Sequence, residues 1–241
     1  MQGESLNGVL IIDKPSGPTS HDVVAMLRKR FRAAKVGHGG TLDPQATGLL
    51  VILLGKGTKL SDRFIGSDKT YHGVIRLGVT TDSEDAEGKV LSEQDCSRVS
   101  ASMLRDQMSA LVGDIYQTPP MVSAVKIAGV PLYKRARKGQ IIERKARLVH
   151  IYEFRMLEFT PPTATFVVRC TKGTYVRTLC ADIGKNLGCG AHLQALRRTG
   201  SGEISVENAI PLNDAMKMDF DALTKHVIPI KSFLQKSLLS S

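Results

Sequence analysis

The stretch "GGTLDPQATGLLVILL", residues 39–54, joins a glycine-rich loop directly to the longest unbroken apolar run of the chain. The apolar half, residues 49–54, carries no charge and predicts a strand buried in the core. The loop half carries one acidic side chain, Asp43, which is followed by Pro44. Two questions follow: which fold surrounds the buried strand, and why a carboxylate stands shortly before it.

The Asp-Pro pair has two explanations. Pro44 disfavours the α region for Asp43 and suits the first turn of a helix, so Asp43 could be a helix N-cap. Against this, Gly48 and the apolar strand leave room for at most one helical turn, and such a cap stabilises little. The glycines at positions 37, 39 and 40 allow the backbone to approach another group closely, such as a ligand. Capping and a reactive carboxylate both stay open from these residues alone.

The pattern of the flanking segments predicts the fold class. Residues 70–79 alternate well enough to form a strand, and residues 97–115 have the apolar spacing of a helix, with Val99, Met103, Leu104, Met108 and Leu111 on one side. Ser20 is a good N-cap for another helix. Residues 191–198 resemble a short helix, followed by a hairpin-like turn at 200–202. Because strands and helices mix without strict βαβ alternation, we expect an α+β fold with a largely antiparallel or mixed sheet.

Length and composition restrict the class of protein. With 241 residues, 42% of them hydrophobic, the chain suits one large domain or one domain with an appendage. No apolar run approaches the roughly 20 residues that a bilayer requires, and the N-terminus does not resemble a signal peptide, so we expect a cytoplasmic protein. The four cysteines and six histidines lack metal-site spacing, so we expect free thiols and no metal.

The charge is unevenly distributed. Lys and Arg number 33 against 23 Asp and Glu, a net charge of +10, which is typical of a protein with a polyanionic partner. Residues 126–150 hold eight basic residues against Glu143 alone. Glycine and proline interrupt this region, so 119–147 is predicted to be an extended basic arm with a short helix around 132–138. It is either a solvated excursion or a clamp that neutralises phosphates. Residues 81–90 are acidic and predict a surface turn.

A second candidate site is "CTKGTYVRTLC", residues 170–180, where cationic and aromatic side chains crowd a glycine turn. If residues 174–178 are extended, Tyr175 and Arg177 point to the same face. A guanidinium is the best partner for a buried carboxylate, because it presents two parallel donors. The alternative is an ordinary edge strand with an exposed arginine.

Five motifs together resemble the TruB family of pseudouridine synthases. In chain order they are "DKPSGPTSHDVV" (13–24), "GHGGTLDPQATGLL" (37–50), "KTYHGVIRLG" (69–78), "KGTYVRTL" (172–179) and "HLQALRRTGSG" (192–202). The similarity covers roughly residues 7–210. It implies the pseudouridine synthase fold, with a mixed, mainly antiparallel sheet flanked by helices and an inserted basic RNA-binding arm.

The resemblance implies an activity and three catalytic residues. The family isomerises uridine to pseudouridine in the T-loop of tRNA, at position 55 in standard tRNA numbering, without cofactor or metal. Matched by motif, Asp43 is the carboxylate that attacks the flipped-out nucleotide. Tyr71 stacks on the target base and takes the proton released at carbon 5. Arg177 pairs with the aspartate and keeps it ionised.

Further residues match the family's binding sites. Tyr175 and Leu196 correspond to residues that pack against the base, and His38 corresponds to the histidine that holds the nucleotide out of its loop. Lys14, with Pro15, belongs to the first motif, which mainly buttresses the site. The basic arm matches an insertion that folds over the RNA, with its contacts assigned to Lys134, Arg135, Arg137 and Lys138.

The family pattern also gives a domain division. We expect a catalytic domain over residues 1–210, with the RNA clamp at about 119–147, and a short tail over 211–241 in place of an RNA-binding PUA domain. We expect a monomer that binds tRNA and requires neither a membrane nor a protein partner. Two alternatives stay open: a chaperone that binds and refolds tRNA, and a pseudouridine synthase with a different RNA site.

Overall fold

The computed structural model describes residues 6–121, 123, 126–127, 130–131, 140 and 142–234. The chain forms two compact units. The terminal unit consists of Met1–Lys69 with Arg197–Ser241, and the central unit is Thr70–Leu196. The division expected at residue 210 stays a prediction.

The sheet of the terminal unit is built around the apolar run of the opening stretch. Strand β3 (Thr47–Leu54) pairs antiparallel with β1 (Gly8–Lys14) along its whole length. Its last residues also pair with β2 (Val36–His38), its first with the end of β12 (Ala191–Ser201), and β14 (Ile210–Pro211) lies beside β1. Residues 48–54 are all buried, which confirms the predicted core strand.

Alternate residues of β3 enter one hydrophobic cluster. Leu49, Val51 and Leu53 pack with residues of β1 and with Leu60 and Phe64. The last two belong to a 3-10 helix, η1 (Gly55–Leu60), and to α2 (Ser61–Gly66). The remaining elements of this unit are β13 (Ile204–Ser205), η2 (Val206–Asn208), α6 (Leu212–Lys217), α7 (Phe220–Thr224) and α8 (Lys231–Leu234).

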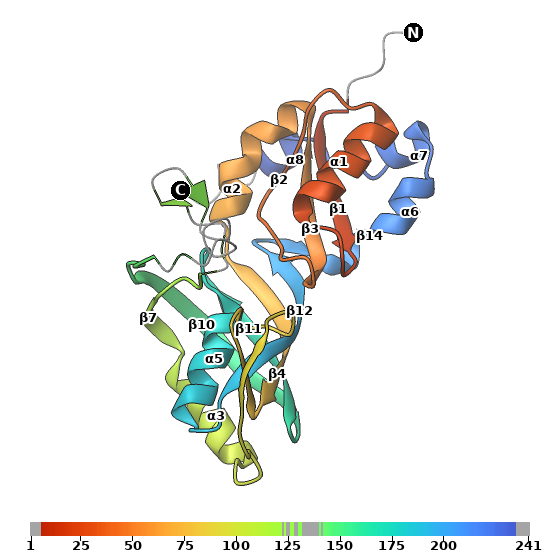
Figure 1. Cartoon of the computed structure of the whole chain (residues 1–241). Helices are drawn as coiled ribbons and strands as arrows, with labels where there is room; N and C mark the ends of the chain where they lie inside the picture. The colour runs from red at the N-terminus through yellow and green to blue at the C-terminus, as the bar shows by residue number, and fades with distance from the viewer. Residues whose placement is uncertain are drawn as a thin grey trace. The chain divides into compact units, whose positions relative to one another are not determined.

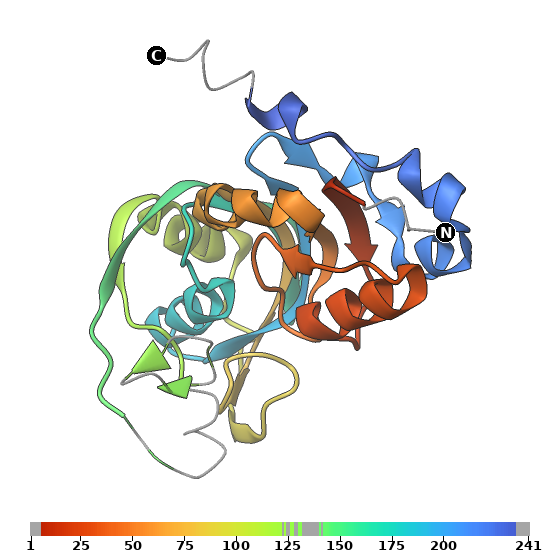
Figure 2. The same cartoon turned by 90° about the horizontal axis from the view of Figure 1, so that it is seen from above.

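Helix α1 (Ser20–Phe31) packs beside α6 (Figures 1 and 2). Its N-cap is Thr19, whose hydroxyl accepts the Asp22 N–H while the Asp22 carboxylate accepts the Thr19 N–H, a complete capping box. The prediction of Ser20 as N-cap was therefore wrong by one residue. The reason is tertiary, because the Ser20 hydroxyl is engaged with Leu42.

The sheet of the central unit has the order β12, β4 (Lys69–Leu77), β11 (Thr163–Cys170), β10 (Arg147–Thr160), β7 (Gly113–Gln117). Helices α3 (Ala101–Ala110) and α5 (Val176–Asn186) lie side by side over this sheet (Figure 1). The described residues of this unit also form four short strands: β5 (Val79–Thr81), β6 (Val90–Glu93), β8 (Lys126–Ile127) and β9 (Val130–Pro131). The α+β class with a mixed, mainly antiparallel sheet is confirmed.

In this unit the strand predicted at 70–79 is confirmed, and the helix predicted at 97–115 is confirmed in part. Strand β4 buries Gly73, Ile75 and Leu77 and exposes His72 and Arg76, as the alternation predicted. Helix α3 is capped by the Ser100 hydroxyl and buries two apolar residues of its predicted face, Leu104 and Met108. It is shorter than the predicted 97–115, because Gly113 has a φ of +104° and residues from there to 117 form β7.

The short helix predicted at residues 191–198 was wrong. These residues are part of strand β12, which pairs with β3 and lies beside β4, so tertiary hydrogen bonding overrides the helix propensity of Ala, Leu, Gln and Arg. The turn at 200–202 does lead into β13, which pairs back onto β12. The helix predicted around 132–138 lies outside the described residues.

Candidate active site

Asp43 lies in the loop between β2 and β3, and its side chain is exposed. The Ala46 N–H donates to the Asp43 carbonyl at 3.1 Å, which closes a four-residue turn with Pro44 in its second position. The chain then enters β3 at Thr47 without forming a helix. Asp43 is therefore the first residue of a turn, and the helix that the capping explanation requires does not form.

Buried polar side chains fix the backbone that leads to Asp43. The Ser20 hydroxyl accepts the Leu42 N–H at 2.8 Å and donates to the Leu42 carbonyl at 3.2 Å. Arg198, only 1% exposed, donates to the carbonyls of residues 40, 41 and 49 at 3.2, 3.3 and 2.7 Å. Because a guanidinium holds its donors in one rigid plane, these contacts set the path of the loop.

Lys14 holds the other side of the loop. Its side chain is fully buried, and its ammonium donates to the carbonyls of Pro15, Pro18 and Pro44, each at 2.9 Å. An ammonium has three protons, so these three acceptors match its capacity. Such an arrangement suits the buttressing role that the family motif implies. The Lys14 ammonium contacts backbone carbonyls, although Lys14 was also predicted to bind RNA. That role stays a prediction.

The glycines of the loop serve the protein's own packing. A Cβ on Gly39 would lie 2.4 Å from the Phe64 Cβ, so the close approach that the glycines allow here is to the core. Gly48 has a φ of +95°, and a Cβ there would lie 2.3 Å from the Arg198 carbonyl oxygen. A side chain at Gly48 would therefore strain the backbone and clash with β12.

His38, on β2, is half-buried in the same unit. Burial lowers the pKa of His38 below its usual range, and the nearby charges of His21 and Arg198 act in the same direction. Its buried Nδ1 has no hydrogen-bond partner within the described residues, and its ring meets the His21 ring edge-on at 5.6 Å. A neutral imidazole of this kind can accept or donate one hydrogen bond to a ligand.

Arg177 lies at the start of α5 in the central unit. Tyr175 is the helix N-cap and Arg177 the second helical residue, so the extended conformation considered for residues 174–178 was wrong. The Arg177 guanidinium is 5.8 Å from the Tyr175 ring centroid. Its Nη1 donates to Oδ2 of Asp85 at 3.2 Å, and the two side chains are 6% and 17% exposed.

The acidic segment 81–90 is only in part the surface turn that its charge predicted. Asp85 and Glu84 turn inward against α5, where Thr178 donates to the Glu84 carboxylate at 2.6 Å. Burial raises the pKa of Glu84, and the Thr178 hydrogen bond and the Arg177 charge oppose that rise. Asp85 was not among the predicted site residues. A buried arginine requires a carboxylate partner, and the acidic residues of this segment were candidates for that partner.

Tyr71 and Leu196 are half-buried and pack against the core of the central unit. Tyr71 lies on β4, and Leu196 is the last residue of that unit on β12. The central unit thus holds Tyr71, Tyr175, Arg177 and Leu196, and the terminal unit holds Asp43, His38 and Lys14. Four predicted RNA contacts lie outside the described residues: Lys134, Arg135, Arg137 and Lys138.

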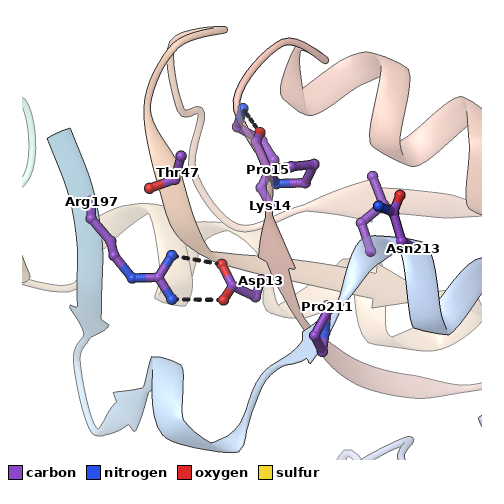
Figure 3. Close-up of a pocket in the computed structure, with 8 residues that line it drawn as sticks. Asp13, Lys14, Pro15, Thr47, Arg197, Pro211 and Asn213 are labelled. Carbon is purple, nitrogen blue, oxygen red and sulfur yellow. Dashed lines mark hydrogen bonds and ion pairs between the residues drawn. The ribbon is translucent and has the colours of Figure 1, made fainter. Parts of the chain in front are cut away.

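A pocket of about 240 Å³ opens in the terminal unit beside the first motif (Figure 3). On one side, Arg197 donates through both terminal nitrogens to the Asp13 carboxylate, at 3.0 and 2.6 Å. This bidentate pair raises the pKa of Arg197 still further. Pro15, Thr47 and Asn213 also line the pocket. The pair ties the start of the first motif to the middle of β12.

Two features are absent from the described residues, a metal-binding group and a membrane-spanning helix. No group of three or more His, Cys, Asp or Glu side chains there is arranged to hold a metal ion. No helix among the same residues has the length and apolarity needed to cross a bilayer.

Comparison with known proteins identifies the family. Residues 28–176 match the model of the TruB family pseudouridylate synthase N-terminal domain, and residues 177–235 match that of the tRNA pseudouridylate synthase B C-terminal domain. A protein of Opitutus terrae named tRNA pseudouridine synthase B is 47% identical over 227 residues, which are 94% of each chain. One of the same name from Syntrophotalea carbinolica is 48% identical over 86% of this chain and 68% of its own length.

Solved structures agree with this assignment. A chain in a Cbf5-Nop10-Gar1 complex superimposes with a TM-score of 0.73 and 31% identity, over 92% of this chain and 60% of its own length. A chain in an H/ACA RNP bound to a substrate RNA containing 2′-deoxyuridine gives a TM-score of 0.69 and 28% identity, over 92% and 58%. This chain thus spans about 60% of the length of the first of these chains. The predicted family is confirmed: the chain belongs to the TruB family of pseudouridylate synthases, which are isomerases.

Proposed function

We propose that this protein isomerises uridine to pseudouridine at position 55 in the T-loop of tRNA, with Asp43 as the attacking carboxylate. The observation that carries the proposal is the loop of Asp43: an exposed carboxylate on a backbone held by the buried side chains of Lys14, Ser20 and Arg198. Such a side chain can reach a nucleotide without reorganising its own support. The tRNA substrate is taken from the names of the relatives.

The reaction exchanges one glycosidic bond for another. The bond between N1 of uracil and C1′ of ribose breaks, the base turns in its pocket, and a bond forms between C5 and C1′. The proton that leaves C5 is balanced by one gained at N1. Asp43 initiates this exchange, and the target base must first leave its stack, as for other enzymes that act on a nucleobase.

The other residues hold the flipped nucleotide and the carboxylate. We assign Tyr71 to stack on the base and to take the C5 proton, with Tyr175 and Leu196 packing beside it. His38 holds the nucleotide out of its loop, for which a neutral ring with an available Nδ1 is suited. We assign Arg177 to orient the Asp43 carboxylate in the RNA-bound enzyme.

We assign the RNA contacts away from the target base to the basic segment 119–147. Its cations would neutralise phosphates of the T-arm and read the shape of the stem-loop. Base reading would then be confined to the flipped nucleotides.

The test uses an unmodified T-arm stem-loop and maps pseudouridine after incubation with the protein. The wild type should form pseudouridine at position 55, and Asp43→Asn should form none while binding the RNA as tightly. Asp62→Asn is the matched control, an exposed carboxylate of the same unit, and should keep full activity. Binding without product from the wild type would refute the proposal and favour an RNA chaperone.

A different RNA target is favoured by one observation, the resemblance to a chain of an H/ACA RNP that binds a substrate RNA. Pseudouridine maps of total RNA from cells with and without the gene decide between targets. Loss of pseudouridine 55 alone supports the tRNA assignment, and loss at another position with position 55 intact replaces it.

A further inference from the structure

Gln117, the last residue of β7, lies against Tyr175 in the central unit. Its side chain is buried, with 2% of the residue exposed. The Tyr175 N–H donates to Gln117 Oε1 at 2.7 Å, and Gln117 Nε2 donates to the Tyr175 carbonyl at 3.1 Å. One side-chain amide thus pairs with both backbone groups of one residue, as a neighbouring strand would.

The residue so held starts the helix that carries Arg177. Tyr175 is the N-cap of α5, with φ −100° and ψ 104°, and no side-chain hydrogen bond caps this helix. The first turn of α5 also contains no acidic residue. Since the usual local stabilisers of a helix start are missing here, the position of Tyr175 depends on tertiary contacts such as that of Gln117.

The backbone of Tyr175 determines where two functional side chains point. The backbone of residue 175 carries the Cα–Cβ bond from which the ring projects, and the Arg177 guanidinium lies 5.8 Å from the centroid of that ring. A change at residue 175 therefore moves the ring and the first turn of α5 together.

Gln117 itself is well anchored. It is paired in register with Arg147 of β10, at the positions where the basic segment 119–147 leaves and rejoins the sheet. Beyond it, Arg144 donates to the Pro119 carbonyl at 2.9 Å. The amide therefore projects from a paired strand end rather than from an isolated loop.

We infer that Gln117 is a positioning residue for the isomerisation: its amide fixes the Tyr175 backbone, so that the Tyr175 ring and Arg177 keep the orientation the target base requires. The inference rests on the roles proposed above for Tyr175 and Arg177. Gln117 acts through Tyr175 and needs no contact with RNA.

Gln117→Met tests the inference, because methionine has a similar length but lacks both amide hydrogen bonds. We expect turnover to fall roughly 10- to 100-fold, as small displacements of reacting groups do, with RNA affinity unchanged. In the RNA-free protein the Tyr175 amide should exchange its hydrogen faster than in the wild type. Tyr116→Phe, a change at a side chain 76% exposed on the same strand, is the control and should alter neither.

Gln117→Glu gives a readout that mere loss of packing would not produce. A protonated carboxyl has one donor and one acceptor, like the amide, whereas the ionised form cannot donate to the Tyr175 carbonyl. The activity of Gln117→Glu relative to wild type should therefore rise as the pH falls. Positive charges on neighbouring elements, those of Arg147 on β10, Arg177 on α5 and Arg144 beyond Pro119, favour the ionised form of the introduced carboxyl, whereas burial favours its protonated form. The pH at which the ratio rises reports this balance, and wild type, which has no carboxyl at position 117, is the reference.

The outcomes separate this inference from the proposed function. Turnover is measured on unmodified total tRNA, so that isomerisation of any uridine is detected; a product at another position removes the position-55 assignment and leaves the Gln117 comparison intact. Equal losses of turnover and RNA affinity in Gln117→Met would overturn the inference. An unchanged rate of hydrogen exchange at the Tyr175 amide of Gln117→Met would also overturn the inference, whichever RNA is the substrate.

Discussion

Arg177 and Asp85 form a buried ion pair, joined by a hydrogen bond of 3.2 Å, with side chains 6% and 17% exposed. Removing one member of such a pair leaves an uncompensated charge in the interior. Asp85→Asn should lower the free energy of unfolding by about 3 kcal/mol and reduce turnover, because Arg177 loses the carboxylate that holds it. Denaturant unfolding and single-turnover kinetics measure both.

The exposed pair of Arg155 and Glu153 is a matched control, since it has the same 3.2 Å separation with side chains 61% and 45% exposed. Glu153→Gln should change stability by about 1 kcal/mol or less. If Asp85→Asn is equally mild, the buried pair does not have the importance assigned to it.

Arg177 should matter for turnover more than for affinity. We expect Arg177→Ala to cut turnover far more than RNA binding, because its proposed task is to orient a carboxylate. Rates and dissociation constants on the T-arm stem-loop give the comparison. Equal losses in both would make Arg177 a phosphate contact instead.

Glu84 should make stability depend on pH. Its pKa is raised by burial above 4.5, the ordinary value, so the folded protein holds this proton more tightly than the unfolded chain does. Ionisation of Glu84 therefore opposes folding, by an amount that grows as the pH rises from about 4.5 through the folded pKa. Glu84→Gln should melt at a higher temperature than wild type at neutral pH, and this advantage should shrink as the pH falls through the folded pKa toward 4.5.

The control for this effect is Glu158→Gln. Glu158 also accepts a hydrogen bond from a threonine, Thr160, but its side chain is exposed on β10. Its substitution should give no pH-dependent difference in melting temperature. A Glu84→Gln difference that stays constant across this pH range would contradict the burial argument.

Lys14 should stabilise both the protein and the Asp43 loop. Lys14→Met removes the donor to three carbonyls, which should lower the free energy of unfolding by roughly 3 kcal/mol. Turnover should fall as well, because the Pro44 carbonyl next to Asp43 loses its ammonium donor. Lys225→Met, at an exposed position of the same unit, should leave stability and turnover unchanged. Full activity of Lys14→Met would show that the loop does not need this support.

The basic arm should account for much of the salt dependence of RNA binding. Neutralising Lys134, Arg135, Arg137 and Lys138 together should weaken binding and flatten the plot of log affinity against log salt, by about 0.7 to 0.9 per lost phosphate contact. Neutralising the exposed Lys217 and Lys225 serves as the comparison. An unchanged slope in the fourfold variant would refute the clamp.

The sequence predicted correctly those elements whose structure follows from the spacing of their own apolar side chains. The apolar run became β3 and the alternating segment became β4, because burial on one or both faces follows directly from side-chain spacing. Residues 191–198 of strand β12 were predicted as helix, since Ala, Leu, Gln and Arg favour helices. Only the pairing of β12 with β3 and its place beside β4 make it a strand.

The site residues divide in the same way, into those that sequence motifs identify and those that only the folded chain brings together. The resemblance to a family supplied Asp43, Tyr71 and Arg177, but Asp85 and Gln117 were not singled out, since each is defined by a partner about 60 to 90 positions away. The support of Asp43 by Arg198 was missed for the same reason, although Arg198 stands in one of the quoted motifs.

The long-range anchoring of the Asp43 loop has a consequence for biosynthesis. Arg198 reaches the carbonyls of Thr41 and Gly40 across 157 and 158 positions of sequence, so these residues leave the ribosome well before their donor is made. Until β12 has emerged and paired, the nascent chain carries the carboxylate without this part of its support. A product truncated before residue 198 would therefore retain Asp43 and still lack the geometry that makes it useful.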